Sequence, residues 1–162
     1  WIGLSQEVEA YITRFESLHD QLGQIVHEIS NDELNWNPIP GETNSPAVLV
    51  THILGAESFR IHQIAGGVEV NRDRESEFSA QLSSVSELES VLYRVRASTY
   101  DVLKKLSPEE LDQIRLAVRS YEGDESVRWH ILHTIEHFGI HLGHLTLTHQ
   151  LYTSGDRNMK GS

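Results

Sequence analysis

The sequence predicts an all-α protein, a four-helix bundle with a long crossover connection between its second and third helices. Three observations favour this fold class. Apolar residues recur at alternating spacings of four and three in several long segments, as they do on the buried face of an amphipathic helix. Helix-capping sequences stand at the starts of these segments. A polar, aperiodic run at 68–84 divides them into two pairs, and its length suits a crossover rather than a tight turn.

The first expected helix covers 4–29. Its apolar positions follow one another at steps of four and three: Leu4, Val8, Tyr11, Phe15, Leu18, Leu22, Ile25 and Ile29. A polar Ser-Asn-Asp-Glu run at 30–33 ends the helix. The segment 34–44 then carries two prolines and a glycine around Trp36, which predicts an ordered loop whose tryptophan covers one end of the core.

The second expected helix covers 46–65, because Ser45 is a favourable N-cap, a proline follows it at the first helical position, and two glycines follow the segment. His52 shares a face with apolar residues: Val48, Leu49, Ala56 and Phe59. At about 100° per residue, Glu57 lies about 140° from His52 and Arg60 about 80° from it. We therefore expect both charged side chains to lie nearer to solvent than the histidine.

The third expected helix begins at a capping box, Ser86-Glu-Leu-Glu89, and continues to about residue 106. Its inward positions again step by four and three: Leu88, Leu92, Val95, Thr99, Val102 and Leu106. In the connection before it, Phe78 is expected to anchor the polar run. After it, Ser107-Pro108 predicts a short helical turn, and period-two character at 114–121 predicts a short strand or an extended link.

The fourth expected helix covers 126–152 and holds six of the ten histidines. With His137 at zero on a helical wheel, four other imidazoles fall within about 40° of it: His130, His133, His141 and His144. Apolar residues flank this stripe on both sides, so it is expected to point into a core. A buried imidazole must be hydrogen-bonded or ligated to avoid a penalty of about 1–3 kcal/mol.

Two of these histidines have the spacing of metal ligands. His137 and His141 lie one helical turn apart, and ring nitrogens at this spacing can bind one metal ion. A third ligand must come from another segment. His52, on the apolar face of the second expected helix, can meet this pair inside a bundle, where helices approach to about 8–10 Å. The alternative is that the three histidines only satisfy hydrogen bonds in the core.

The other histidines are given lesser roles. His133 and His144 occupy the same stripe, where each can line the site, hydrogen-bond a ligand or act as a general base, and for both the first two roles are favoured over direct ligation of the metal. No role is assigned to His149, which lies about 120° from the stripe, or to the histidines on polar faces: His19, His27 and His62.

Gly139 and Gly143 lie on the outward side of the fourth expected helix, although each lowers helix propensity by about 1 kcal/mol relative to alanine. Close packing inside the monomer and a contact between two subunits explain the pair about equally well. Because the histidine face points toward its own core, we expect the outward face to form a homodimer.

Composition limits the classes of function. The 162 residues fit a single domain, 1–162. There is no cysteine, so any metal ligands must be imidazole, carboxylate or water. The net charge of −11 and the pI near 5.3 argue against nucleic acid or an anionic membrane as a partner. The sequence contains no apolar run of about 18 residues and no basic-then-apolar leader, so we expect a cytoplasmic protein that acts on a small-molecule substrate.

Three segments resemble the DinB/YfiT-like superfamily of metalloenzymes: Trp36-Asn-Pro-Ile-Pro-Gly41, Val50-Thr-His52-Ile-Leu-Gly-Ala-Glu57 and Trp129-His-Ile-Leu-His133-Thr-Ile-Glu-His137-Phe-Gly-Ile-His141-Leu-Gly-His144. The linker at 71–78 is also similar to that of the family. The resemblance implies a four-helix bundle in which a divalent metal is held by His52, His137 and His141. Many members read His-Arg-Gly-Gln where this chain has His141-Leu-Gly-His144, so roles tied to that Arg or Gln do not transfer.

Characterised relatives in this superfamily include thiol-dependent transferases and isomerases and metal-dependent hydrolases. The resemblance therefore implies metal-activated thiol transfer or hydrolysis at an open three-histidine site, with a low-molecular-weight thiol as a further cofactor in the first case. Zinc, nickel, iron and manganese all accept imidazole and water ligands, and His133 is the candidate proton carrier. The alternative is a non-catalytic bundle that binds metal or serves as a histidine-rich, pH-sensitive interaction module.

Overall fold

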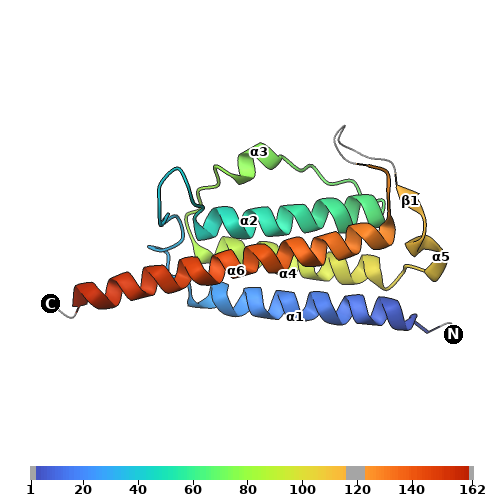
Figure 1. Cartoon of the computed structure of the whole chain (residues 1–162), viewed down its shortest axis with the longest axis horizontal. Helices are drawn as coiled ribbons and strands as arrows, with labels where there is room; N and C mark the ends of the chain where they lie inside the picture. The colour runs from blue at the N-terminus through green and yellow to red at the C-terminus, as the bar shows by residue number, and fades with distance from the viewer. Residues whose placement is uncertain (1–2, 116–122, 161–162) are drawn as a thin grey trace.

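The computed structural model describes residues 3–115 and 123–160. Four long helical segments form a bundle (Figure 1): α1 (Gln6–Glu28), α2 (Pro46–Glu57) with its π-helical continuation η1 (Ser58–Ala65), α4 (Val85–Leu103) and α6 (Val127–Lys160). The other elements are short: α3 (Arg74–Glu77), α5 (Pro108–Leu111), β1 (Ile114–Arg115) and β2 (Glu125–Ser126). The predicted all-α four-helix bundle is confirmed.

The predicted crossover connection is also present. Residues 68–84, here called the strap, pass over the outer side of α2 and carry α3 (Figure 1). Asn35 holds the far end of the strap, because its Nδ2 donates to the Leu82 carbonyl at 2.8 Å and its Oδ1 accepts from the Leu82 N–H at 3.2 Å. The strap is therefore tied to the loop that follows α1.

Serine side chains cap the first turns of α1 and α2. Ser5 Oγ accepts a hydrogen bond from the N–H of Val8 at 3.2 Å, and Ser45 Oγ accepts one from the N–H of Val48 at 3.3 Å. These bonds satisfy N–H groups that have no partner within the helix. The predicted helix start at Pro46 is confirmed.

The predicted capping box of α4, Ser86 to Glu89, is wrong. The box is formed two residues earlier, by Ser84 and Glu87. Both pairs have the sequence of a capping box, but the carboxylate of Glu87 also accepts from the N–H of Ser83 at 3.0 Å. The earlier start therefore satisfies one more backbone group at the end of the strap.

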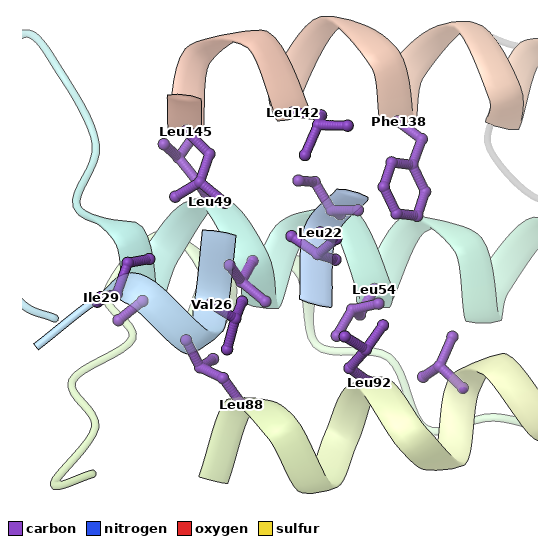
Figure 2. Close-up of a cluster of buried hydrophobic side chains, with 14 of the residues drawn as sticks. Leu22, Val26, Ile29, Leu49, Leu54, Leu88, Leu92, Phe138, Leu142 and Leu145 are labelled. Carbon is purple, nitrogen blue, oxygen red and sulfur yellow. The ribbon is translucent and has the colours of Figure 1, made fainter. Parts of the chain in front are cut away.

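Apolar side chains from all four long segments form the core (Figure 2). Its larger cluster includes Leu22 and Val26 of α1, Leu49 and Leu54 of α2, Leu88 and Leu92 of α4, and Phe138, Leu142 and Leu145 of α6. A second cluster includes Val8, Phe15, Ile61, Leu103 and Ile131. Complete burial of one such side chain contributes about 1.5–3 kcal/mol, so these positions hold the helices together.

Helix α2 is buried on all sides rather than on one face. Ten of its twelve residues are buried, because α4 and α6 pack against it within the bundle and α3 packs against it from outside. Glu57 is 0% exposed, so the prediction that it lies near solvent is wrong, whereas Arg60 is partly exposed. A helical wheel does not separate core from solvent in a helix that has neighbours all round.

Glu57 belongs to a buried polar cluster that joins α1, η1 and α4. Its carboxylate accepts hydrogen bonds from His19 Nε2 at 2.9 Å and from the hydroxyl of Thr99. Nε2 of His62 lies 2.9 Å from Thr99 Oγ1, and burial lowers the pKa of His62. The prediction that His19 and His62 lie on polar faces is therefore wrong. These bonds satisfy a carboxylate that would otherwise be costly to bury.

Gly139 and Gly143 lie on an exposed face of α6, beside three side chains that are about half exposed: Leu132, Ile140 and Leu147. A Cβ added at either glycine would meet no atom of the described residues within 4 Å. Close packing inside the monomer is therefore wrong as an explanation for the glycines. The homodimer contact stays a prediction.

The remaining short elements close the end of the bundle near the start of α6. The predicted turn at Ser107-Pro108 is confirmed as α5, which Ser107 caps by accepting from the N–H of Glu110 at 3.2 Å. β1 and β2 pair in antiparallel orientation. The predicted strand is present as Ile114–Arg115, and its remainder, 116–121, lies outside the described residues. None of the described helices combines the length and apolar character that a membrane crossing needs.

Candidate metal centre

Three histidine rings meet between α2 and α6. His52 comes from α2, and His137 and His141 come from successive turns of α6. One ring nitrogen of each lies within 4.8 Å of those of the other two, and the ring centroids are 4.5–4.9 Å apart. Within 3–115 and 123–160, this is the group of ligand-type side chains with a geometry that fits a metal ion. The two segments therefore meet as predicted, while ligation itself stays a prediction.

The histidine stripe of α6 lies beside the core rather than in it. The core-facing side chains of α6 are apolar and lie about 100° round the helix from the stripe: Ile131, Phe138, Leu142 and Leu145. Along the stripe, His130 is buried, His137 and His141 are half-buried and His144 is exposed. The prediction that the stripe points into a core is wrong, and its position at the edge leaves His137 and His141 partly exposed, whereas His52 is buried.

Glu77 of α3 fixes the orientation of the His52 ring. Its Oε2 lies 2.9 Å from Nδ1 of His52. Because a carboxylate only accepts hydrogen bonds, Nδ1 carries the proton and Nε2 presents a lone pair toward His137. Arg72 completes the arrangement by donating to both carboxylate oxygens, at 2.6 and 2.9 Å. Burial would raise the pKa of Glu77, but the bonds from Arg72 and His52 outweigh burial and lower it.

Spacing and periodicity did not identify Arg72 or Glu77. Both lie in the strap, which has no helical or strand period from which a facing direction can be deduced. The one signal in the sequence was the likeness of 71–78 to the linker of the family. Phe78, expected as an anchor of this segment, packs against His52 with ring centroids 4.9 Å apart.

Nε2 of His52 lies only 3.0 Å from Nε2 of His137, which restricts where the protons on these two rings can be. With Nδ1 of His52 protonated, its Nε2 is an acceptor. Two lone pairs at this distance repel one another, so either Nε2 of His137 carries a proton or a cation lies between the rings. Imidazole nitrogens without thiolate ligands suit zinc, nickel, iron or manganese, so the side chains present fit a divalent metal.

His137 and His141 are neutral at pH 7. Burial, together with the neighbouring imidazoles, lowers the pKa of His137 to about 3 and that of His141 to about 4. The neutral ring is the form that ligates a metal. Protons therefore do not compete with a metal for these nitrogens near pH 7.

Metal-free protein is expected to lose stability as the pH falls from about 6.5, the value for an unperturbed histidine, toward 4. Because the folded pKa values are about 3 and 4, in this window the unfolded chain binds protons at positions 137 and 141 while the folded protein does not. The free energy of unfolding then rises with pH, by up to about 1.4 kcal/mol per pH unit for each group. Partial exposure of the rings reduces the pKa shifts and therefore narrows this pH window.

Thermal unfolding of chelator-treated protein between pH 4.5 and 7 measures this effect. The double variant His137→Gln/His141→Gln lacks both groups and is expected to show a smaller loss of melting temperature over the same range. An equal loss in the two proteins would mean that other groups cause the acid sensitivity.

Gly55 allows the strap to approach α2 closely. A Cβ at position 55 would lie 2.3 Å from Oε1 of Glu77 and 2.9 Å from its Cδ, so Gly55→Ala must displace the carboxylate. We expect this variant to be destabilised by about 1–3 kcal/mol and to bind metal more weakly. Urea unfolding and metal titration measure the two effects.

Gly23→Ala in α1 is the matched control for this substitution. Its Cβ would meet Leu92 Cδ2 at 3.6 Å, which is an ordinary contact. The higher helix propensity of alanine is therefore expected to raise the free energy of unfolding by about 0.5–1 kcal/mol. If Gly55→Ala were as stable as the control and bound metal normally, the close contact with Glu77 would have no importance.

His133 lies beside the three-histidine group. Its ring stacks on Trp129, with centroids 4.8 Å apart and an interplanar angle of 9°, and lies 6.3 Å from the ring of His137. His130, which is buried, lies with Nδ1 3.1 Å from Nη1 of Arg60. His133 therefore lines the space next to the site, as predicted, whereas His130 packs behind it.

His144 and His149 lie toward the other end of α6. Nδ1 of His144 is 3.4 Å from Nδ1 of His141, so His144 is a neighbour of one candidate ligand, although it is exposed. Nδ1 of His149 is 2.9 Å from Oε1 of Glu33, which is 1% exposed. Burial raises the pKa of Glu33. His149 therefore links α6 to the turn after α1 and does not contact the candidate metal centre.

A pocket of about 430 Å³ opens in front of His52 and His137. Its other lining residues come from α2, η1, the strap, the segment before α6 and α6 itself: Ala56, Arg60, Arg72, Arg74, Gly123, Glu125, Trp129 and His133. A volume of this size can hold a small organic molecule. A substrate in the pocket would therefore contact two of the three candidate ligands.

Comparisons with known proteins agree on the family and the fold. The profile of the DinB superfamily matches residues 14–145. A search of curated proteins finds no significant match. Among solved structures, a DinB-like protein from Bacillus cereus superposes with a TM-score of 0.74 at 13% identity, covering 90% of this chain and 92% of its own. A DinB-like protein from Bacillus subtilis gives a TM-score of 0.69 at 20% identity, covering 89% of this chain and 92% of its own.

A further structural relative corrects one expectation from the sequence. The colibactin self-resistance protein ClbS, solved in complex with a dsDNA, gives a TM-score of 0.65 at 15% identity, covering 88% of this chain and 95% of its own. The exclusion of nucleic acid on the basis of net charge is therefore wrong. Net charge is a sum over the whole surface, whereas a duplex contacts one face, so an acidic total does not exclude such a partner.

The three lines of observation agree. The bundle and its crossover are those that the sequence predicted, the histidines converge from the two expected helices, and the superfamily profile covers well over half of the chain. The chain belongs to the DinB superfamily.

Proposed function

We propose that this protein is a divalent-metal-dependent enzyme in which His52, His137 and His141 hold the metal ion. The observation that carries the proposal is the convergence of three ring nitrogens within 4.8 Å of one another, from two different helices. The proton on Nδ1 of His52, held by Glu77 at 2.9 Å, supports it. Three protein ligands leave positions for water or substrate, which is the arrangement of a catalytic site rather than a structural one.

The reaction types that this site supports are thiol transfer and hydrolysis. A divalent ion supplies Lewis acidity and lowers the pKa of a water molecule or thiol that ligates it. The protein's own side chains would orient the reactants. His133 lines the pocket beside His137, where its imidazole can accept a proton from the nucleophile and return it to the leaving group. Trp129, stacked on His133, holds that ring in place.

The proposed cofactors follow from the same ligands. Zinc, nickel, iron and manganese are the candidate metals, because all four accept imidazole and water. A low-molecular-weight thiol is a further cofactor if the reaction is thiol transfer. The pocket of about 430 Å³ beside the histidines is the proposed substrate site.

Metal analysis of protein purified without a histidine tag and without added metal tests the proposal. About one equivalent of a divalent metal is expected. Less than a tenth of an equivalent, with a melting temperature that zinc, nickel and manganese leave unchanged, would favour a metal-free interaction module instead. If metal is present, assays with thiols and electrophiles, and with simple esters and amides, separate an enzyme from a non-catalytic metal-binding bundle.

A further inference from the structure

Three arginines line the pocket in front of the histidines: Arg60, Arg72 and Arg74. The chain as a whole has 13 lysines and arginines against 24 acidic residues. Among the described residues that line this pocket, Glu125 is the acidic one. Cationic side chains are therefore concentrated here in a protein that is otherwise strongly acidic, and this concentration needs an explanation.

Arg72 lines the pocket because it forms an ion pair with Glu77. Its guanidinium donates to both oxygens of Glu77, and its side chain is 10% exposed. The pair is close to neutral, and it orients His52. Arg72 therefore serves the histidine site and contributes little positive charge to the open part of the pocket.

Arg74 is more exposed than Arg72 and makes a weaker ion pair. Its side chain is 44% exposed and lies 3.7 Å from the carboxylate of Glu75, which is 91% exposed. An exposed ion pair of this kind is weak because water screens it, so it competes little with a ligand for the guanidinium. The same group lies over the ring of Phe78 at 5.0 Å, next to His52. Arg74 thus presents a positive charge at the edge of the pocket that holds the candidate ligands.

Arg60 lines the same pocket from η1. Its guanidinium lies 5.6 Å from the centre of the Trp129 ring, and its Nη1 lies 3.1 Å from Nδ1 of the buried His130. Arg60 of η1 and Trp129 of α6 therefore place a cation beside an aromatic ring in the lining of the pocket. A substrate in the pocket would therefore lie near the Arg60–Trp129 pair, while Arg74 lines the pocket from the strap.

We propose that the substrate carries an oxyanion, a carboxylate or a phosphate, that Arg74 binds while the reacting part of the substrate faces the three histidines. This inference rests on the proposed metal-dependent function, whose site it extends. A guanidinium can donate two parallel hydrogen bonds to such an anion, and with one end held the reacting group is positioned at the site. The local positive charge also counteracts the repulsion of an anion by the acidic protein.

Binding of matched small molecules tests the inference. The probes are benzoate, phenyl phosphate and the neutral isostere benzamide, titrated into zinc-loaded protein and followed by ligand-observed NMR. At least one of the two anions is expected to bind about tenfold or more tightly than benzamide, since a charged hydrogen-bonded pair contributes about 1.5–3 kcal/mol. Comparison of benzoate with phenyl phosphate identifies the preferred oxyanion.

Arg74→Gln separates binding by the arginine from direct ligation of zinc. This variant is expected to lose about tenfold in anion affinity, with unchanged benzamide affinity and zinc content. Arg94→Gln, an exposed position of α4 away from the pocket, is the matched control and is expected to bind like the wild type. If Arg74→Gln bound both anions as tightly as the wild type, the anions would contact only zinc and the inference would be overturned.

The same titrations on metal-free protein distinguish failure of this inference from failure of the proposed function. Protein that takes up zinc but shows no preference for either anion retains the proposed metal site and rejects the anion site. Protein that takes up no metal, yet binds an anion in a manner that Arg74→Gln abolishes, rejects the metal-dependent function and retains the anion site.

Discussion

Replacement of His137 by alanine is expected to abolish both metal binding and any turnover. His137 is central to the group, because its Nε2 lies 3.0 Å from Nε2 of His52 and its ring centroid lies 4.5 Å from that of His141. Without it, two imidazoles remain, and they come from different helices. Two such ligands do not hold a divalent ion against solvent as three do, so the metal content should fall from about one equivalent to less than a tenth.

Thermal unfolding gives an independent measurement of the same loss. At a free metal concentration of about 100 times Kd, binding stabilises the folded state by about 2.7 kcal/mol. For a domain of this size each kcal/mol raises the melting temperature by about 2–4 °C, so the wild type should rise by about 5–10 °C. The His137→Ala variant is expected to show no rise, although its metal-free form should remain folded because the core side chains of α6 are unchanged.

His27→Ala is a suitable control for this experiment. His27 lies in α1, and its side chain is 86% exposed, so its removal should leave metal content and the metal-induced rise unchanged. His144→Ala is a second comparison, because His144 adjoins His141. If His137→Ala kept its metal while His144→Ala lost it, the ligand pair would be the later two histidines of the stripe and the site assigned above would be wrong.

The fold could be predicted because the long helices have regularly spaced apolar residues. In α1 and α4 the four-three spacing marks the residues that contact the other helices, such as Leu22 and Leu88. The histidine group could also be predicted in part, since His137 and His141 share a helix and their relative position follows from its geometry. That His52 joins them depends on how the helices pack, which the apolar faces indicate.

The burial of Glu57, the direction of the histidine stripe and the start of α4 could not be predicted, because each depends on which segments pack against the helix. Glu57 lies opposite His52 on the wheel, yet the additional neighbours of α2 bury both. The histidine stripe has apolar flanks on both sides, and the sequence does not say which flank meets the core. Ser84 and Ser86 both begin plausible capping boxes, and the choice is made by a hydrogen bond from the strap. Sequence periodicity predicts which face of a helix is apolar, but it does not predict which segments pack against that face.

Glu77→Ala is the other substitution with a large expected effect, although residue 77 contacts no metal in the proposed site. Its carboxylate holds the proton of His52 on Nδ1. Without that acceptor, Nδ1 and Nε2 of His52 become similar in proton affinity, and the ring can turn away from His137. Loss of a carboxylate partner of a metal-binding histidine typically weakens metal affinity by about 10–100-fold. The guanidinium of Arg72 also loses its partner.

Competition with a chromophoric chelator measures this change in affinity, because it reports metal binding without requiring a known substrate. Glu75→Gln is the matched control, since Glu75 lies in the same short helix but is 91% exposed and faces Arg74 rather than a histidine. We expect the control to bind metal like the wild type. The metal affinity of Glu77→Gln should lie between those of Glu77→Ala and the wild type, because an amide oxygen can still accept from Nδ1 but carries no charge. A metal affinity of Glu77→Ala within twofold of the wild type would show that packing against Phe78 alone orients His52.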